Sequence, residues 1–287
     1  MPKTHENTFI MIKKVIHLAD THIPNSNDER PYDIMLKQLM SSIYKEIKND
    51  NPEEVRIVIV GDIFHQKVKT TNEAKSMFHM VLNYLNEMGC RVYIIAGNHD
   101  LLVRNTLRKD SIAPTFEING AYPNIHYLDK TLNYKSGYVI DDNIVWALYS
   151  IYDKYAQPSV VELNEHSEGK TVVGLYHGDC IGAVTDVGYT SEDKGIDANY
   201  FSGCDCVMAG HIHKHQVLKK GGIPLVYAGS AIQQNLGENI TGHGFVVWDM
   251  TKMKFKFKEV KNEYRLLKFH IDSYDDVKDD VERLMNL

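Results

Sequence analysis

Apolar residues in the first hundred positions follow two alternating patterns. Three short runs of consecutive apolar residues, rich in β-branched side chains, predict strands buried on both faces of a parallel sheet: 15–19, 56–60 and 92–96. Between these runs, apolar residues recur at helical spacing over 32–47 and again between Thr70 and Gly89. Thr70 with Glu73 predicts the start of the second helix, and Gly89 predicts its end. Successive β–α units favour right-handed crossovers and a parallel sheet, so the predicted fold class is α/β.

After residue 100 the pattern changes to shorter strands joined by turns. Segments 138–140 and 144–148 predict a hairpin. Further apolar runs predict strands at 171–176, 205–208, 225–228 and 245–249. Lysine alternates with apolar residues over 252–258, which predicts an edge strand whose lysines deter pairing with another chain. A phosphate-binding stripe is the alternative.

The chain divides into three parts by this pattern. Residues 1–13 are expected to form a polar extension, and residues 14–265 the main domain. Residues 266–287 carry a predicted strand at 266–271 and an acidic helix at 273–285, and we expect them to begin a further module.

Composition adds limits to this picture. The 287 residues are 43% hydrophobic and 24% charged, as in ordinary globular proteins. A net charge of −6 provides no overall basic field, so any phosphate-binding surface must be local. Four cysteines do not make a disulfide framework, and Cys204 and Cys206 are interpreted as core residues rather than metal ligands. Without a transmembrane run or signal peptide, the protein is expected to be soluble and intracellular, in the cytoplasm or at the nucleoid, with no membrane partner.

Metal-binding side chains follow five of the predicted strands. They are Asp20 and His22, Asp62 with His65, Asn98 and His99, His177, and His211 and His213. Ligands in α/β sheets bind at the carboxyl ends of strands, where these residues fall. Carboxylate, imidazole and amide oxygen together suit manganese, iron or zinc. The residues are too many for one tetrahedral site but about right for two ions that share a bridging carboxylate, an arrangement that suits phosphoryl transfer.

The motifs resemble those of the calcineurin-like metallophosphoesterases. They are Asp20-x-His22, Gly61-Asp62, Gly97-Asn98-His99-Asp100, His177 and Gly210-His211-x-His213. The longer motif Gly61-Asp62-Ile63-Phe64-His65 resembles the nuclease branch. Segments 210–214 and 226–230, with Gly237-Glu238, are similar to the SbcD (Mre-eleven) DNA-repair nucleases. The resemblance covers roughly residues 14 to 270.

The resemblance implies a fold, an activity and partners. The fold would be a four-layer α/β/β/α sandwich with the metal site at the C-terminal ends of the strands. The activity would be cleavage of DNA phosphodiesters, as both exonuclease and endonuclease, with two Mn²⁺ per chain or iron, zinc or magnesium in their place. The partners would be DNA, a second copy of the chain in a homodimer, and a coiled-coil ABC ATPase of the SbcC type. Family members usually carry a DNA-binding cap after this domain, so residues 266–287 are expected to be the start of a truncated or absent cap.

The resemblance also implies a role for each site residue. Asp20, His22 and His213 would hold the first metal together with Asp62. Asp62 would bridge to the second metal, held by Asn98, His177 and His211. His99 would stabilise the transition state or protonate the leaving oxygen, and Asp100 would orient His99. His65 matches a position linked to exonuclease action, although a histidine that merely precedes a helix is an equal alternative.

The remaining histidines are expected to lie outside the site. His17 and His126 are expected to be packed or solvated, and His215 to lie on the surface. The others expected at the surface are His5, His79, His166, His243 and His270. Basic residues on loops near the motifs are candidate DNA contacts: Lys67, Lys69, Arg104, Arg108 and Lys109.

Two competing functions remain open. A phosphodiesterase of the same superfamily, acting on cyclic nucleotides or small diesters, would use the same ligands and differ only in substrate access. A non-catalytic scaffold would predict missing ligands, and every expected ligand is present in the sequence.

Overall fold

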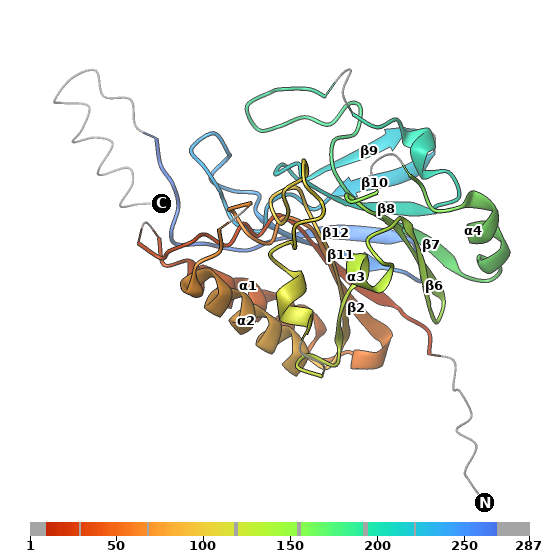
Figure 1. The fold of residues 1–287 in the computed structure, drawn as a ribbon, viewed down its shortest axis with the longest axis horizontal. Helices are drawn as coiled ribbons and strands as arrows, with labels where there is room; N and C mark the ends of the chain where they lie inside the picture. The colour runs from red at the N-terminus through yellow and green to blue at the C-terminus, as the bar shows by residue number, and fades with distance from the viewer. Residues whose placement is uncertain are drawn as a thin grey trace, which may run out of the picture.

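Two β-sheets packed face to face form the centre of the molecule, with helices outside them (Figure 1). This computed structural model describes residues 10–268 apart from 29, 68, 118–119, 154–155, 192–194 and 221. The predicted polar extension lies largely outside the described residues, and the predicted C-terminal helix lies wholly outside them.

The first sheet has six strands in the order β12-β11-β1-β2-β3-β4. Their bounds are β1 Lys14–Leu18, β2 Val55–Val60, β3 Arg91–Ile95, β4 Ile125–Tyr127, β11 Gly244–Asp249 and β12 Lys254–Glu259. Strands β1 to β4 are parallel, as the predicted β–α units require, while β11 runs antiparallel to β1. Leu18 lies opposite Ile59, and Ile59 lies opposite Ile94, so β1, β2 and β3 end at about the same level. The loops that follow these strands therefore begin beside one another.

The second sheet also has six strands, in the order β5-β6-β7-β8-β10-β9. Their bounds are β5 Gly137–Asp141, β6 Ile144–Tyr149, β7 Thr171–His177, β8 Cys206–Gly210, β9 Gln216–Lys220 and β10 Ile223–Tyr227. The predicted hairpin is present as β5 and β6, and β6, β7, β8 and β10 run parallel. His177 lies opposite Gly210, so β7 and β8 also end together.

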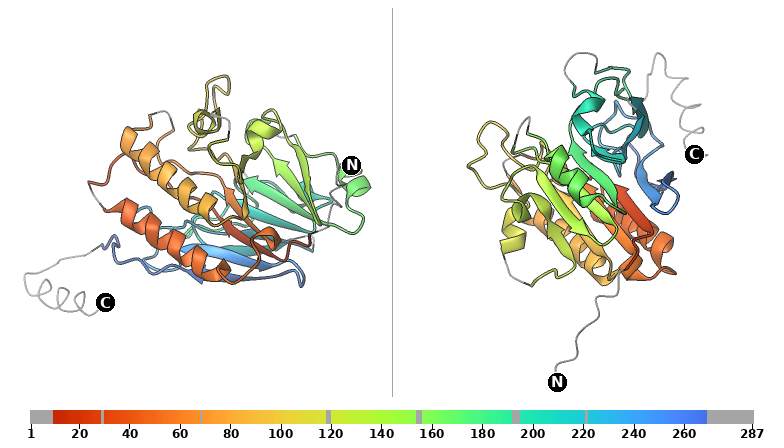
Figure 2. Two further views of the ribbon diagram at one scale, coloured as in Figure 1. Left: turned by 90° about the horizontal axis from the view of Figure 1, so that it is seen from below. Right: turned by 90° about the vertical axis from the view of Figure 1, so that its right-hand side faces the viewer.

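Helices cover the outer face of each sheet. Helix α1 (Tyr32–Ile47) and helix α2 (Asn72–Glu87) lie side by side on the first sheet, and their buried apolar residues form one core with it (Figure 2). Helix α4 (Val160–His166) and the 3₁₀ turn Ala198–Phe201 pack on the second sheet. Smaller elements are α3 (Leu128–Thr131) and the 3₁₀ turns Pro52–Glu54 and Ala113–Glu117. The order helix, sheet, sheet, helix confirms the expected α/β/β/α sandwich.

Several local predictions need adjustment. Helix α2 is capped by Thr71, whose hydroxyl accepts a hydrogen bond from the Ala74 amide, rather than by Thr70. Residues 266–268, the described part of the predicted last strand, are not in a strand. Strand β12 lies at the sheet edge as predicted, with Lys254 and Lys256 exposed. Among the described residues, no helix is both long and apolar enough to cross a membrane.

Candidate metal centre

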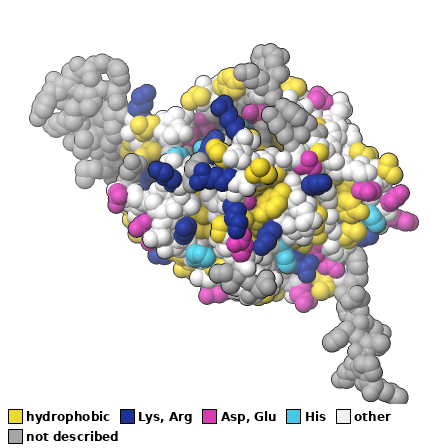
Figure 3. Space-filling model, viewed as in Figure 1, with side chains coloured by type: hydrophobic (Ala, Val, Ile, Leu, Met, Phe, Trp, Pro, Cys, Tyr) yellow, Lys and Arg dark blue, Asp and Glu magenta, His cyan; other side chains and the backbone are white. Residues whose placement is uncertain are grey.

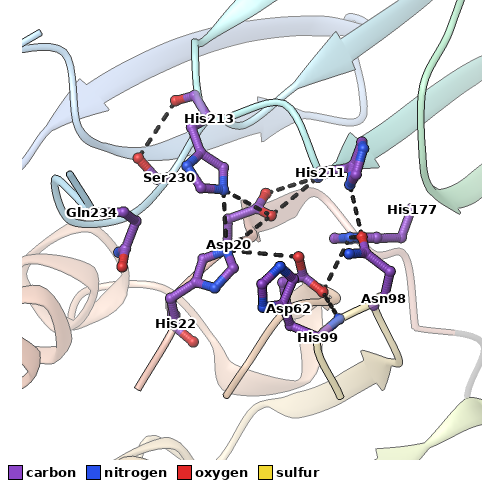
Figure 4. Close-up of polar contacts among 12 residues, drawn as sticks. Asp20, His22, Asp62, Asn98, His99, His177, His211, His213, Ser230 and Gln234 are labelled. Carbon is purple, nitrogen blue, oxygen red and sulfur yellow. Dashed lines mark hydrogen bonds and ion pairs between the residues drawn. The ribbon is translucent and has the colours of Figure 1, made fainter. Parts of the chain in front are cut away.

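The polar residues predicted from the five strand ends converge where the two sheets meet (Figure 4). Three of those strands, β1, β2 and β3, belong to the first sheet, and two, β7 and β8, belong to the second. The sheets approach closely here, because His177 Nδ1 lies 2.8 Å from the Val60 carbonyl oxygen across the sandwich. Each sheet thus contributes about half of the site.

One group of donors consists of Asp20, His22 and His213, whose ligand atoms lie close enough to hold one ion. The Nε2 atoms of His22 and His213 are 3.0 Å apart. Each of these nitrogens lies 3.8 Å from Asp20 Oδ1. Asp20 and His22 are buried between the sheets, so an ion here would have few competing water ligands.

A second group consists of Asp62, His177 and His211. His177 Nε2 lies 3.3 Å from Asp62 Oδ1 and 3.2 Å from Asn98 Oδ1. His211 Nδ1 lies 2.8 Å from the same amide oxygen of Asn98. Asn98 therefore points into this group, as the fourth predicted donor of a second site.

Asp62 stands between the two groups. Its Oδ1 faces His177, while its Oδ2 lies 3.6 Å from His22 Nε2, a member of the first group. Asp62 also forms a third compact group with His22 and His99. Asp62 therefore faces donors of both groups.

The backbone is strained at four of these residues. Asp20, His22, Asp62 and His211 have φ values of 52°, 43°, 51° and 95°, in the left-handed region that residues other than glycine seldom adopt. Such strain persists only where surrounding structure enforces it, and it is concentrated at functional sites. Gly97 permits the tight packing, since a Cβ there would lie 2.2 Å from Asp62 Oδ1.

Electrostatics couple the carboxylates and imidazoles. Burial by itself would lower the pKa of His177, but the adjacent Asp62 carboxylate raises it to about 10. Burial likewise opposes ionisation of Asp62, yet His177 holds the pKa of Asp62 well below its usual range. Burial lowers the pKa of His22, which favours the neutral imidazole that coordinates metals. Ionised Asp62 and neutral His22 are both suited to coordination.

His99 lies beside the donors, but its orientation differs from our expectation. Its Nδ1 lies 2.7 Å from the His65 carbonyl oxygen, so that carbonyl, rather than Asp100, orients the ring. The buried carboxylate of Asp100 instead accepts hydrogen bonds from the amides of Gly97, Ile63 and Phe64. Asp100 therefore fixes the loops after β2 and β3 relative to each other. The His65 ring lies 5.9 Å from that of His99, between centroids, and is exposed.

Two carboxylates behind the histidines were not singled out as site residues. Glu238 Oε1 lies 2.7 Å from His213 Nδ1, and Asp179 Oδ2 lies 3.5 Å from His211 Nε2. Both contacts involve the ring nitrogen that faces away from the neighbouring donors. The His177-Gly178-Asp179 sequence contained the signal for Asp179, and the Gly237-Glu238 motif contained that for Glu238, although His213, which it contacts, lies 25 residues earlier.

The other histidines follow the predictions only in part, since His79 and His166, both expected at the surface, are half-buried. His17 is buried, as expected for packing, and His215 is half-buried, with its ring stacked on Phe257 rather than turned to the metal centre. His243 was expected at the surface but is buried, because its ring bonds Ser230 on one side and the Asn239 carbonyl on the other. Cys204 and Cys206 are buried free cysteines, which confirms core packing. His5 and His270 lie outside the described residues.

Comparison with known proteins gives the family. The model of the calcineurin-like phosphoesterase superfamily domain matches residues 14–253. The chain belongs to this superfamily. Membership supports a phosphoester hydrolase and implies divalent metal binding. Converging imidazole nitrogens, a carboxylate shared by two donor groups and strained ligand residues all fit such ions.

Two individual relatives of this phosphoesterase have low sequence identity to it. An uncharacterised protein of Acanthamoeba polyphaga mimivirus is 31% identical over 268 residues, which cover 91% of this chain and 19% of that protein. Exonuclease subunit 1 of Enterobacteria phage T4 is 24% identical over 204 residues, covering 70% of this chain and 55% of the subunit. The chain therefore spans about a fifth and about half of these two relatives.

Among solved structures, GAP50, the anchor in the inner membrane complex of Plasmodium, has 14% identity and a TM-score of 0.51. The match covers 87% of this chain and 89% of GAP50. At this identity, the likeness shows the fold alone.

Proposed function

We propose that this phosphoesterase is a manganese-dependent DNA nuclease that hydrolyses phosphodiester bonds from ends and within strands. The observation that carries the proposal is the position of Asp62 between two donor groups, with the His99 ring alongside. The exonuclease name of the phage relative supports a nucleic acid as the substrate.

The bound ions would supply charge neutralisation of the phosphate and activation of water. Asp20, His22 and His213 would hold one ion, and Asn98, His177 and His211 the other, with Asp62 between them. Four of these donors, Asp20, His22, Asp62 and His177, are buried, which strengthens the electrostatic interactions among them.

His99 would act on the leaving oxygen. Its Nδ1–H donates to the His65 carbonyl, which fixes the ring and leaves Nε2 as the atom available to a substrate. In the imidazolium form, Nε2–H can hydrogen-bond the departing oxygen and transfer its proton. The His22 and His99 rings are 4.8 Å apart between centroids, so this group adjoins the scissile phosphate rather than a remote part of the substrate.

The surroundings suit a sugar–phosphate backbone. A cleft of about 710 Å³ next to His99 is lined by polar and basic side chains: Asn25, His65, Gln66, Lys67 and Lys69. Arg104, Arg108 and Lys109 are exposed on the loop after β3. On the face drawn in Figure 3, basic side chains gather near the middle of the molecule. These positive charges can compensate locally for the acidic chain.

A substrate panel tests the proposal. Linear duplex DNA, cyclic AMP and a chromogenic diester would be offered side by side with Mn²⁺, and we expect DNA to have the highest kcat/KM. Preference for cyclic AMP would favour the small-diester function instead. His99→Ala should abolish DNA cleavage while metal content, by mass spectrometry, stays near that of the wild type.

We further propose that the chain works in DNA repair or recombination as a homodimer with a coiled-coil ATPase of the SbcC type. The relative named as an exonuclease subunit supports a multisubunit enzyme. Helices α1 and α2 expose Ile34, Tyr44 and Tyr84, which could contribute to a dimer surface. Sedimentation velocity of the wild type and of Tyr44→Lys would test this surface. A dimeric wild type and a monomeric Tyr44→Lys variant would support it, and the same sedimentation coefficient for both would oppose it.

A further inference from the structure

Three histidines of the metal centre differ in the hydrogen-bond partner of Nδ1. His177 Nδ1 faces the Val60 carbonyl, 2.8 Å away. The buried Nδ1 of His22 has no hydrogen-bond partner among the described residues. His213 Nδ1, by contrast, faces the Glu238 carboxylate at 2.7 Å. Among Asp20, His22 and His213, the His213 ring is therefore the one that a carboxylate holds from outside the group, and that carboxylate belongs to Glu238.

Glu238 is itself held by an unusually complete set of donors. Its side chain is 5% exposed, and each carboxylate oxygen has two neighbours within hydrogen-bonding distance. Oε1 faces the His213 ring and accepts from the Asn235 side-chain amide at 2.7 Å. Oε2 accepts from the Gln234 backbone amide at 2.8 Å and from the Ser230 hydroxyl at 3.3 Å. A carboxylate held by so many donors has little freedom to rotate.

The segment that carries these donors, residues 229–238, is here called the backing loop. Its Ser230 amide donates to the His213 carbonyl at 2.8 Å, and Ser230 forms a β-bridge with Ala19, next to Asp20. Gln234 donates to the Tyr32 hydroxyl at 2.9 Å, which joins the loop to α1. Gly229 makes the fit possible, because a Cβ there would lie 2.9 Å from the His213 carbonyl oxygen. Figure 4 shows Ser230 and Gln234 flanking the His213 side of the centre.

We propose that Glu238 is a positioning residue that holds His213 in the tautomer with hydrogen on Nδ1, so that the Nε2 lone pair points at the ion held with Asp20 and His22. A carboxylate accepts hydrogen bonds but donates none, so His213 Nδ1 must carry the proton in this contact. Neutral imidazole then has its lone pair on Nε2, which lies 3.0 Å from His22 Nε2. The inference rests on the metal centre of the proposed function, but it is independent of the substrate.

Manganese binding, measured by titration calorimetry without substrate, tests this role. Supporting groups of this kind affect metal affinity by roughly 10- to 100-fold. We expect Glu238→Gln to weaken one of two binding steps by about that factor and to leave the other unchanged. The glutamine amide cannot replace the carboxylate, since turning its oxygen to His213 places its NH₂ against the Gln234 amide, also a donor. Glu238→Ala should weaken the same step at least as much.

A matched control is Glu259→Gln. Glu259 is an exposed carboxylate that accepts a hydrogen bond from the Gly242 amide and does not contact the metal centre. This variant should bind both ions as the wild type does. Thermal unfolding of the metal-free proteins shows whether each variant is folded, and the isosteric Glu238→Gln remains informative if Glu238→Ala does not fold.

The tautomer can be observed directly in the metal-free protein. Long-range ¹H–¹⁵N spectra distinguish the two neutral tautomers, and His213→Ala assigns the signal. Wild type should show the Nδ1–H form, and Glu238→Gln should show a mixture or the other form. Wild-type Mn²⁺ affinity and an unchanged tautomer in Glu238→Gln would overturn the proposal. Absence of Mn²⁺ binding by the wild type would overturn the metal centre itself, whereas binding without DNA cleavage would contradict only the nuclease proposal.

Discussion

Replacing Gly97 by alanine should disable the metal centre with the addition of a single methyl group. An added Cβ would lie 2.2 Å from both the backbone nitrogen and Oδ1 of Asp62. Ordinary contacts of this kind exceed about 3 Å, so Asp62 or the loop after β3 must move by roughly 1 Å. Asp62 faces both donor groups, and a misplacement of that size costs about 100-fold in rate.

Gly137→Ala provides the matched control. A Cβ at Gly137 would meet only Leu132 side-chain carbons, at 3.6 and 3.7 Å, and neither Gly97 nor Gly137 has the positive φ that would add backbone strain. In Gly97→Ala the added methyl group therefore overlaps Asp62, whereas in Gly137→Ala it makes ordinary van der Waals contact with Leu132. Hydrolysis of a chromogenic diester with Mn²⁺, metal content by mass spectrometry and thermal unfolding should be compared for both.

We expect Gly97→Ala to lose about 100-fold in kcat/KM, to retain less metal, and to unfold at a lower temperature because overpacking costs about 1–3 kcal/mol. Gly137→Ala should resemble the wild type in all three. A Gly97→Ala variant with wild-type activity and metal content would refute the argument that Asp62 must keep this position.

Three further predictions address stability. Burial lowers the pKa of His17 to about 3, against 6.5 when unfolded. Between pH 6.5 and pH 3 the unfolded state therefore binds more protons than the folded state, and stability falls as the pH falls through this range. Urea unfolding should show the wild type losing about 2 kcal/mol relative to His17→Leu between pH 8 and pH 5, and a pH-independent difference would contradict this. Asp141→Asn should cost about 3 kcal/mol without changing Mn²⁺ affinity, because the buried Arg56 loses its buried carboxylate partner and keeps Asp142, which is more exposed, at 3.2 Å. A calorimetric scan with wild-type Tm would oppose this. Chelator dialysis should lower Tm, and Mn²⁺ at 100 times its Kd should restore about 2.7 kcal/mol, whereas an unaltered Tm would argue against binding to the folded state.

The first half of the fold was predictable because its signals are local. Helix α1 begins and ends at the predicted residues 32 and 47, since its apolar stripe is continuous. Buried parallel strands such as β2 read as unbroken apolar runs. Strand β9 was missed, because Gln216–Lys220 gains strand structure from pairing with β10 rather than from an apolar run.

The donor set of the site was also predictable, whereas its supports were not. Asp20, His22 and Asp62 follow apolar strands directly, so parallel topology alone brings them to one edge. Asp100 was assigned to the wrong partner, because its contacts with the amides of Ile63 and Phe64 depend on how two loops pack. The contact of Glu238 with His213 depends on the path of the backing loop, which no local sequence pattern specifies.

The arrangement of the ions tests the central claim most directly. A crystal of the Mn²⁺-loaded protein, measured at the manganese absorption edge, should show two anomalous peaks roughly 3.5–4 Å apart. Both peaks should contact Asp62, one beside His22 and His213 and the other beside His177 and His211. A single peak, or two peaks of which only one touches Asp62, would contradict the two-ion centre.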